Sequence, residues 1–432
     1  MKSKFDTGIW KRRKLGAEEI SKINPSSGEK KDYFAYIDLE NVSHGKLKNY
    51  QFFDKKDAPS RAQRILSDSD ILFQLVRPYQ KNNLLFHKEC DFQVVASTGY
   101  AQIRSVISSV FLYYYMHTDE FVGKVLSLCT GSNYPAITSN SLSEIFICYP
   151  QKEIEQRHIA EILSTCDEVI EKTEAAIAKY RAIKAGMMQE LFTRGLDANG
   201  KLRPRPEAAP GLYKDSELGL IPKEWEVEQF DICFELHRNN TFARALLSDQ
   251  PGNVYNIHYG DVLIKYNDHL DCKTNNIPSL TENAEKMSGD DFIKEGDVIF
   301  ADTAEDDTVG KVIEIINVGS LKIVSGLHTI FSHPIKPLFV SKWLGFFLNS
   351  DMFHAQMLPY VVGSKVSSIS RENIKKTYVV YPSKKEQQNV VNSLTTLAKQ
   401  ISVEERTLQK YQSIKQGLMK KLLTPPEGAL EA

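Results

Sequence analysis

The sequence predicts an α+β protein: two globular segments of mixed α/β structure, separated by a pair of long antiparallel coiled-coil helices and related by a pseudo-two-fold repeat. Three observations lead to this fold class. At 432 residues the chain is too long for one ordinary domain. Two stretches of 39 residues, 155–193 and 386–424, match without gaps at a constant offset of 231, with 14 identical positions. Both stretches place apolar residues at coiled-coil spacing.

The chain order follows from this repeat. The first globular segment is expected over 1–150 and a first long helix over 151–194. The next 30 residues, 195–224, hold four prolines and several glycines, which is typical of a surface linker. The remaining ranges are a second globular segment over 225–382, a second long helix over 383–424 and a tail over 425–432.

Each long helix is expected to span roughly 58 Å at 1.5 Å per residue. Gly195 ends the first helix and Pro425-Pro426 ends the second. The shared register favours antiparallel packing of the two helices on each other over two independent core helices. The seam of the first helix steps by four and three residues through Cys166, Ile170, Thr173, Ile177, Tyr180, Lys184, Met187 and Leu191.

The repeat continues upstream of each helix. Residues 131–142 and 363–374 each resemble a loop and a short helix with Ser or Thr caps, and a β-rich strand ending in Tyr-Pro follows both. A weaker match places Trp10 against Trp225 at the start of each globular segment.

Composition limits the class of protein. No apolar run approaches the ~20 residues needed to span a bilayer, and the N-terminal residues lack the apolar stretch of a signal peptide. The cysteines are scattered without a C-x-x-C pair, which argues against a zinc site or disulfide framework and predicts a cytoplasmic protein. They are Cys90, Cys129, Cys148, Cys166, Cys233 and Cys272.

Catalytic motifs are not found in the sequence. There is no phosphate-binding P-loop, no dinucleotide fingerprint, no methyltransferase tetrad of the Asn-Pro-Pro-aromatic kind and no H-E-x-x-H. An acidic cluster could hold Mg²⁺, but it lacks the Glu-x-Lys of a common nuclease core, which favours a solvated or structural loop. Its members are Asp302, Glu305, Asp306 and Asp307.

Contact with DNA has more support, although any one of the candidates is more often a solvated turn. Residues 1–148 have a net charge of +4 and residues 226–380 a net charge of −7, so positive charge must be local or supplied by a partner. Hydroxyl, aromatic and basic side chains on turns beside strands could reach phosphates or base edges. The candidates are Ser60, Arg61, Arg64, Arg77, Tyr79, Ser97, Thr98 and Tyr100 in the first segment, and His258, Tyr259, Lys265, Lys311, Ser325, His328, Thr329 and Lys365 in the second.

The chain resembles the specificity subunit of type I restriction-modification enzymes over essentially its full length. The paired helices carry the resemblance, together with the stretches at 219–225, 257–266, 300–312 and 325–330. The resemblance implies a non-catalytic subunit with two target-recognition domains, each reading one half of a bipartite, asymmetric site on double-stranded DNA. It also implies helices that set the gap between the half-sites.

The resemblance further implies partners. Methyltransferase subunits would dock on the helices and bring S-adenosylmethionine, and restriction subunits would bring ATP-driven translocation with Mg²⁺, so this subunit would hold no cofactor or metal of its own. Two alternatives remain: a stand-alone nuclease or methyltransferase, and a coiled-coil scaffold that does not bind DNA. The residues that the resemblance places in the scaffold are Tyr180, Lys184, Met188, Tyr411, Lys415 and Met419.

Overall fold

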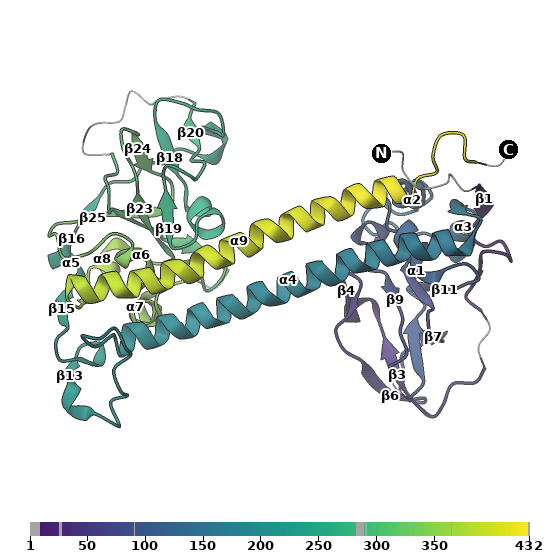
Figure 1. The fold of residues 1–432 in the computed structure, drawn as a ribbon, viewed down its shortest axis with the longest axis horizontal. Coiled ribbons are helices and arrows are strands. Elements are labelled where there is room, and N and C mark those ends of the chain that lie inside the picture. The colour runs from purple at the N-terminus through teal and green to yellow at the C-terminus, as the bar shows by residue number, and fades with distance from the viewer. Residues whose placement is uncertain are drawn as a thin grey trace. The chain divides into compact units, whose positions relative to one another are not determined.

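The two copies of the repeated stretch form two long helices, α4 (Glu153–Thr193) and α9 (Lys384–Leu422), in a computed structural model of the chain (Figure 1). The structure describes residues 9–25, 28–89, 91–281, 289, 292–363 and 365–430. Both the N-terminal residues 1–8, on which the expectation about a signal peptide rests, and Cys90 lie outside these ranges. No helix among the described residues is long and apolar enough to cross a membrane.

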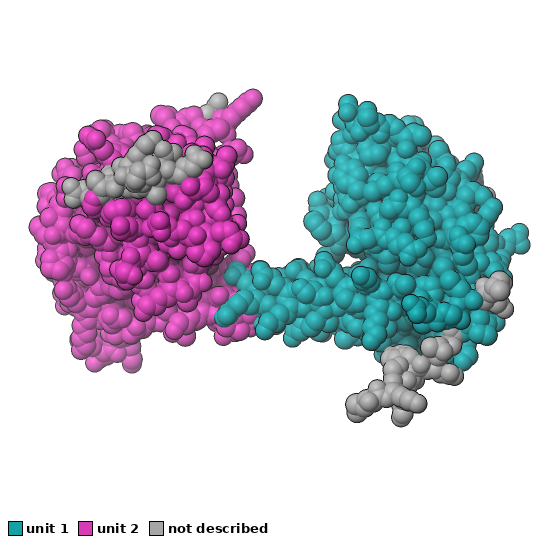
Figure 2. Space-filling view, turned by 90° about the horizontal axis from the view of Figure 1, so that it is seen from above, with its two compact units in different colours: residues 1–175, 405–432 teal, residues 176–404 magenta. Residues whose placement is uncertain are grey.

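The chain divides into two units, shown in different colours in Figure 2. Unit 1 comprises residues 1–175 and 405–432, and unit 2 comprises residues 176–404. Each unit therefore contains one globular head, the first part of the helix that follows this head, and the last part of the other helix. Head 1 runs from Trp10 to Pro150 and head 2 from Glu226 to Tyr381.

Within each unit the two helices pack antiparallel. In unit 1, Leu163 of α4 shares an apolar core with Leu418 of α9. In unit 2, Leu191 of α4 shares a core with Val390 of α9. Residues later in α4 thus pack against residues earlier in α9, which confirms the predicted antiparallel pair. Gly195, at φ +62°, ends α4 in a left-handed cap whose N–H donates to the carbonyl of Leu191.

Head 1 contains two four-stranded sheets, with strand orders β6-β3-β10-β7 and β2-β11-β8-β9. An antiparallel ladder between its first and last strands, β1 and β12, closes the head. The elements are β1 (Trp10–Lys14), β2 (Ser21–Ile23), β3 (Tyr33–Ile37), β4 (Val42–Ser43), β5 (Lys46–Leu47), β6 (Gln51–Asp54), β7 (Ala62–Ile65), β8 (Ile71–Gln74), β9 (Leu84–Leu85), β10 (Val94–Ser97), β11 (Tyr100–Ser105), α1 (Ser109–Tyr115), α2 (Asp119–Ser127), α3 (Ser139–Ser143) and β12 (Phe146–Pro150).

Head 2 contains sheets of order β17-β20-β18-β24 and β16-β25-β21-β23-β19 and is closed by a ladder between β15 and β27. Its elements are β15 (Glu226–Gln229), α5 (Phe230–Cys233), β16 (Phe234–His237), β17 (Leu247–Ser248), β18 (Tyr255–Ile257), the π-helical turn η5 (Asp261–Lys265), β19 (His269–Asp271), β20 (Ser279–Leu280), β21 (Val298–Ala301), β22 (Thr303–Ala304), β23 (Val312–Ile316), β24 (Ile323–Ser325), β25 (Thr329–Pro334), α6 (Trp343–Phe347), α7 (Asp351–Met357), β26 (Ser367–Ser368), α8 (Arg371–Ile374) and β27 (Tyr378–Tyr381).

The repeat is as clear in the heads as in the helices, although the sequence shows it only faintly there. Each head has a matching parallel strand pair, β3 with β10 and β18 with β24, and a matching central antiparallel pair, β8 with β11 and β21 with β25. Head 2 has a second parallel pair, β19 with β23. The predicted loop, capped short helix and final strand are present in both heads as α3–β12 and α8–β27. The order of these paired strands is therefore retained where side chains have diverged, although head 2 adds β19 at the edge of its second sheet.

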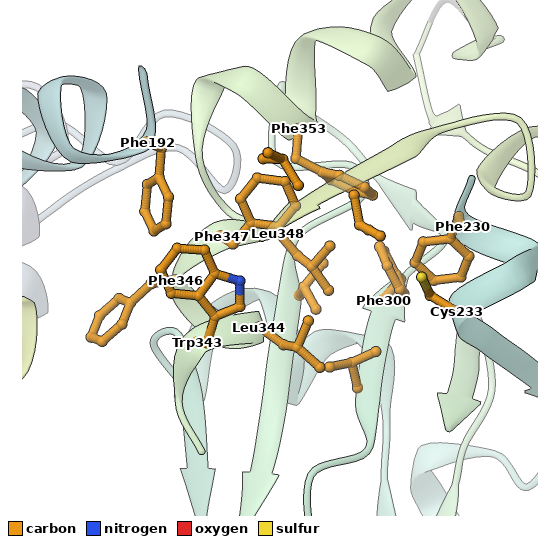
Figure 3. Close-up of a cluster of buried hydrophobic side chains, with 14 of the residues drawn as sticks. Phe192, Phe230, Cys233, Phe300, Trp343, Leu344, Phe346, Phe347, Leu348 and Phe353 are labelled. Carbon is orange, nitrogen blue, oxygen red and sulfur yellow. The ribbon is translucent and has the colours of Figure 1, made fainter. Parts of the chain in front are cut away.

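The core of unit 2 joins its head to both helices (Figure 3). The indole of Trp343 stacks on Phe347 at 6.2 Å and meets Phe192 of α4 edge-on at 5.3 Å. Aromatic pairs in such geometry add about 0.5–1.5 kcal/mol to the free energy of area burial. The end of α4 is thus part of the core of this head.

The linker is an ordered segment fastened to unit 2. It contains the hairpin β13 (Tyr213–Ser216) and β14 (Gly219–Pro222). Before the hairpin, the buried guanidinium of Arg203 donates to both carboxylate oxygens of Glu386, at 2.6 and 3.0 Å. Glu386 also accepts from the indole N–H of Trp225 at 3.1 Å. The expected surface linker therefore has a buried, charge-paired attachment.

Candidate nucleic-acid interface

In head 2, several predicted DNA-contacting residues come together on the loops that follow β18 and join β24 to β25. The rings of His258 and Tyr259 lie 4.6 Å apart, and Tyr259 meets His328 edge-on at 5.4 Å. The Nδ1 atom of His328 lies 3.4 Å from a carboxylate oxygen of Asp302, and this carboxylate also accepts from the hydroxyl of Thr303. The result is a polar aromatic cluster with His328 and Asp302 at its exposed side.

The parallel pairing of β18 with β24 creates this cluster. Ile257 pairs with Ser325, so the residues after both strands leave the sheet at the same edge. Gly326 is needed there because a Cβ atom would lie 2.6 Å from the carbonyl oxygen of Ile257. His328 has a left-handed backbone with φ +54°, and its carbonyl accepts from the N–H of Asp302 at 3.1 Å. Left-handed non-glycine residues are uncommon and concentrate at functional sites.

Burial lowers the pKa of His258 below the usual histidine range. The carboxylate of Asp261 raises the pKa and the guanidinium of Arg244 lowers it, and the effect of burial is the largest of these. His258 is therefore neutral near pH 7, with one ring nitrogen available as a donor and the other as an acceptor.

Other predicted residues of head 2 face its interior. Ser325 and Thr329 are buried and hydrogen-bond to each other at 2.6 Å, so they support the turn. The ammonium of Lys311 donates to the carbonyls of Leu263 and Tyr266, at 2.8 and 2.7 Å, so it is bound to the backbone of the η5 turn. Burial lowers the pKa of Lys311. The two last candidates of head 2, Lys265 and Lys365, are exposed instead.

Head 1 has an equivalent loop with different chemistry. The N–H of Leu75 donates to the carbonyl of Gly99, and the carbonyl of Leu75 accepts from the N–H of Ile137. In head 2, the N–H of Asp302 donates to the carbonyl of His328, and the carbonyl of Asp302 accepts from the N–H of Ile369. Two residues after Leu75, Arg77 adopts φ +53° and its guanidinium lies 4.3 Å from the ring centre of Tyr134. Leu75 and Gly99 of head 1 thus match Asp302 and His328 of head 2, and head 1 has its stacked arginine two residues after the first of these positions.

The remaining candidates of head 1 divide between surface and core. Ser60, Arg61 and Tyr79 are exposed, and the N–H of Thr98 donates to the carbonyl of Arg61 at 2.8 Å. Arg64 is half-buried, and burial lowers its pKa. Ser97 and Tyr100 are fully buried and face the interior of the head.

The sequence does not single out Tyr134, and it places Asp302 in an acidic cluster for which a solvated or structural loop is favoured over a Mg²⁺ site. Tyr134 is 65% exposed, which for an aromatic side chain beside an arginine is a signal of an interaction surface. Among the described residues, no group of three or more His, Cys, Asp or Glu side chains is placed to hold a metal ion. In the predicted acidic cluster, Asp306 instead accepts from the backbone N–H and hydroxyl of Thr308, which lower its pKa.

The two lysines predicted to lie in the scaffold occupy equivalent positions. Lys415 of α9 pairs with Asp167, and its ammonium lies 5.4 Å from the ring centre of Tyr114 in head 1. Lys184 of α4 pairs with Asp268 of head 2, and its ammonium lies 5.5 Å from the ring of Phe346. These lysines therefore attach the last part of each helix within its unit.

The other four scaffold residues lie at or near the surface. Met188 and Met419 are half-buried, Tyr180 is half-buried, and Tyr411 is 37% exposed. Ile183 and Ile414, which are also identical between the repeats, are 42% and 53% exposed. Both helices thus have an exposed apolar face in the segment where their sequences agree best.

These features define a duplicated, two-headed α+β protein whose heads share a backbone plan and differ at their surface loops. A family model described as type I restriction modification DNA specificity domain matches residues 63–179 and 222–413. Because these ranges cover more than half of the chain, the protein belongs to this family.

Individual relatives agree with this assignment. The chain is 22% identical to the type I restriction enzyme MjaVIII specificity subunit of Methanocaldococcus jannaschii over 332 residues, which are 75% of this chain and 71% of that protein. It is 26% identical to the HindI specificity subunit of Haemophilus influenzae over 172 residues, or 38% of this chain and 36% of that one.

Solved structures share the fold. The crystal structure of a type I restriction-modification S subunit from M. genitalium aligns with a TM-score of 0.56 at 13% identity, covering 98% of both chains. A chain from a study of complex assembly and conformational transition of the type I R-M system aligns with a TM-score of 0.55 at 18% identity, again over 98% of both. The family resemblance inferred from the sequence is confirmed.

Proposed function

We propose that this chain is the non-catalytic subunit that gives a type I restriction-modification complex its DNA specificity, with each head reading one half of a bipartite, asymmetric site. The observation that carries the proposal is the matched pair of loops: Arg77 on Tyr134 in head 1 and His328 beside Asp302 in head 2. Readers of one ancestral site would keep the same side chains, whereas readers of two different half-sites need different ones.

Two kinds of chemistry follow from these loops. A guanidinium reads guanine through its O6 and N7 acceptors, and stacking on Tyr134 limits the orientations of Arg77. A carboxylate such as that of Asp302 accepts from the amino group of cytosine, while a neutral histidine such as His258 both donates and accepts. With head 2 at a net charge of −7, we propose that partner subunits supply much of the phosphate contact.

The exposed apolar faces support docking of two copies of one partner. Ile183 and Ile414 are equivalent in the repeat, so a surface that fits one fits the other. We infer that the partners are methyltransferase subunits, which bring S-adenosylmethionine, and that restriction subunits add ATP- and Mg²⁺-dependent translocation. Changing each isoleucine to Asp should remove one partner copy per variant, as measured by native mass spectrometry. Ile154→Asp, at an exposed position outside the repeat, is the control.

The test of DNA reading is a map of methylated adenines in DNA from cells that contain the complex. A split site with two different halves is expected. Arg77→Ala should relax one half of the site and His328→Ala the other, each by about 1–3 kcal/mol of discrimination at one base pair. If both variants keep the original site, the loops do not read DNA. If the purified chain alone methylates or cuts DNA, it is an enzyme, and the non-catalytic assignment is wrong.

A further inference from the structure

Ile264, in the turn η5 of head 2, has an unusual environment. Its side chain is 89% exposed, more than any other large hydrophobic side chain of the described residues. Isolated exposed apolar residues are common, but the next most exposed large hydrophobic side chains of the described residues, Tyr134 and Val362, are 65% exposed. The turn is also a π-helix, a conformation that is rare and frequent at functional sites.

The backbone around Ile264 is firmly held. On one side, Asp261 is buried and its carboxylate accepts from Arg244 at 2.7 Å. On the other side, Tyr266 is buried and its hydroxyl donates to the carbonyl of Asn276 at 3.0 Å. The ammonium of Lys311 bridges the carbonyls on both sides of Ile264. A rigid turn that exposes an isoleucine is prepared for binding, since little conformational entropy remains to be lost.

The surroundings of the turn favour an anionic partner. Arg244 is paired with Asp261, whereas Lys265 and Lys311 have no carboxylate at ion-pair distance among the described residues. The turn therefore carries local positive charge in a head whose net charge is −7. Only Gly260 separates its first residue, Asp261, from the His258–Tyr259 pair of the polar aromatic cluster, and the N–H of Asp261 donates to the carbonyl of His258.

We propose that Ile264 is a specificity-determining residue that contacts the C5-methyl group of a thymine in the major groove of the half-site read by head 2. This inference rests on the proposed function. Thymine is the only base with an apolar group in the major groove, and apolar side chains recognise it by burying that methyl group. Lys265, next in the chain, contributes charge toward the neighbouring phosphates.

Replacing thymine by uracil removes only this methyl group and gives a direct test. The chain in complex with its methyltransferase partner would be titrated with duplexes of the mapped site in which each thymine is replaced in turn. One replacement should weaken binding about fourfold, the factor that corresponds to one buried methyl group. Ile264→Ser should lose a similar factor on the thymine duplex and bind the thymine and uracil duplexes equally, whereas Ile264→Val should keep the preference.

Ile335→Ser is the matched control, since Ile335 is 55% exposed in the same head. Ile335 comes directly after β25, whereas His328 comes directly before this strand, so the two residues lie at opposite ends of it. It should behave as the unchanged chain. Persistence of every uracil effect in Ile264→Ser would overturn the proposal, as would the absence of any uracil effect in the unchanged chain. Loss of partner assembly in Ile264→Ser would assign this residue to a protein contact instead. A complex that does not prefer its site over a scrambled duplex would contradict the proposed function itself.

Discussion

At the scale of residues, the identities shared by the two repeats have specific contacts. Lys184 and Lys415 are identical because each places an ammonium between a carboxylate and an aromatic ring of its unit. In unit 1 the hydroxyl of Tyr114 also donates to Asp167 at 2.6 Å, so three side chains form one network. The two sites differ in the ring, Tyr114 against Phe346, and in the origin of the carboxylate, which belongs to α4 in unit 1 and to head 2 in unit 2.

Lys415→Met should lower the free energy of unfolding by about 1–2 kcal/mol, because it removes one member of a half-buried ion pair and leaves Asp167 without it. Urea denaturation of the chain measures this effect. Lys410→Met, at an exposed position of the same helix, should change stability by less than about 0.5 kcal/mol. In a double-mutant cycle with Asp167→Asn the two losses should not add, and full additivity would refute the contact.

His117 makes the stability of unit 1 dependent on pH. Burial lowers its pKa from 6.5 to about 4. Above pH 6.5 both the folded and unfolded states hold it neutral, so it has no effect on the pH dependence there. As pH falls from 6.5 to about 4, the unfolded state takes up a proton and the folded state does not, so stability falls by about 2–3 kcal/mol.

His117→Gln should remove this part of the acid sensitivity, which urea titrations at pH 7.5, 5.5 and about 4.5 would detect. The variant can be less stable at every pH, but its slope between these values should be shallower than that of the unchanged chain. An identical slope would show that the histidine does not titrate differently in the two states. His269, whose pKa burial also lowers to about 4, makes the same contribution in unit 2.

At the scale of elements, a glutamine joins each long helix to its head. The amide of Gln387 donates to the carbonyls of Pro382 and Leu338 and accepts from the N–H of Val340. Gln156 donates to Pro150 and accepts from Ser108 in the same way. Both glutamines are almost fully buried. Each glutamine therefore links the first turn of its helix to the end of the preceding strand and to a loop of the head.

Gln387→Ala should cost about 2–3 kcal/mol of unfolding free energy, because buried backbone groups lose their partners. Gln156→Ala, which removes fewer hydrogen bonds, should cost less. Gln388→Ala provides the control, as this neighbouring side chain is exposed and donates to Asn392 on the same helix. Equal effects at 387 and 388 in thermal or urea unfolding would rule out the proposed junction.

The elements also show how much the sequence could predict. The helices were predicted to within two residues, because their apolar spacing, Gly195 and Pro425 are local signals. The surface of the heads was harder to predict. Lys311, Ser325 and Thr329 were expected on the surface and point inward, since tertiary hydrogen bonds determine where a turn residue faces. The left-handed backbones of Arg77 and His328 have no glycine to indicate them.

At the scale of the whole molecule, each long helix is divided between the two units, whereas each head belongs to one unit. Each unit needs the last part of the helix that begins in the other, as the cores around Leu191 and Leu418 show. A change in the length of one helix alone would therefore shift its register against the other. A change made at the same repeat position in both helices would preserve their pairing within each unit.

This symmetry gives a test of the proposal that the helices set the gap between half-sites. Four residues inserted after Ala178 and four after Gln409, its repeat equivalent, add about one helical turn, or roughly 6 Å, to both helices. At 3.4 Å per base pair, the preferred gap in the methylation map should lengthen by about one to two base pairs. Both half-sites should stay the same, since neither recognition loop is changed.

The single insertion after Ala178 serves as the control. It adds the same residues to α4 but leaves α9 unchanged, so the packing of α4 on α9 around Leu163 and around Leu191 cannot both be kept, and it should reduce stability as well as DNA binding. A paired insertion that leaves the gap unchanged would show that the helices join the heads without measuring the distance between half-sites. A paired insertion that alters a half-site would place sequence reading on the helices, and the heads would then need another function.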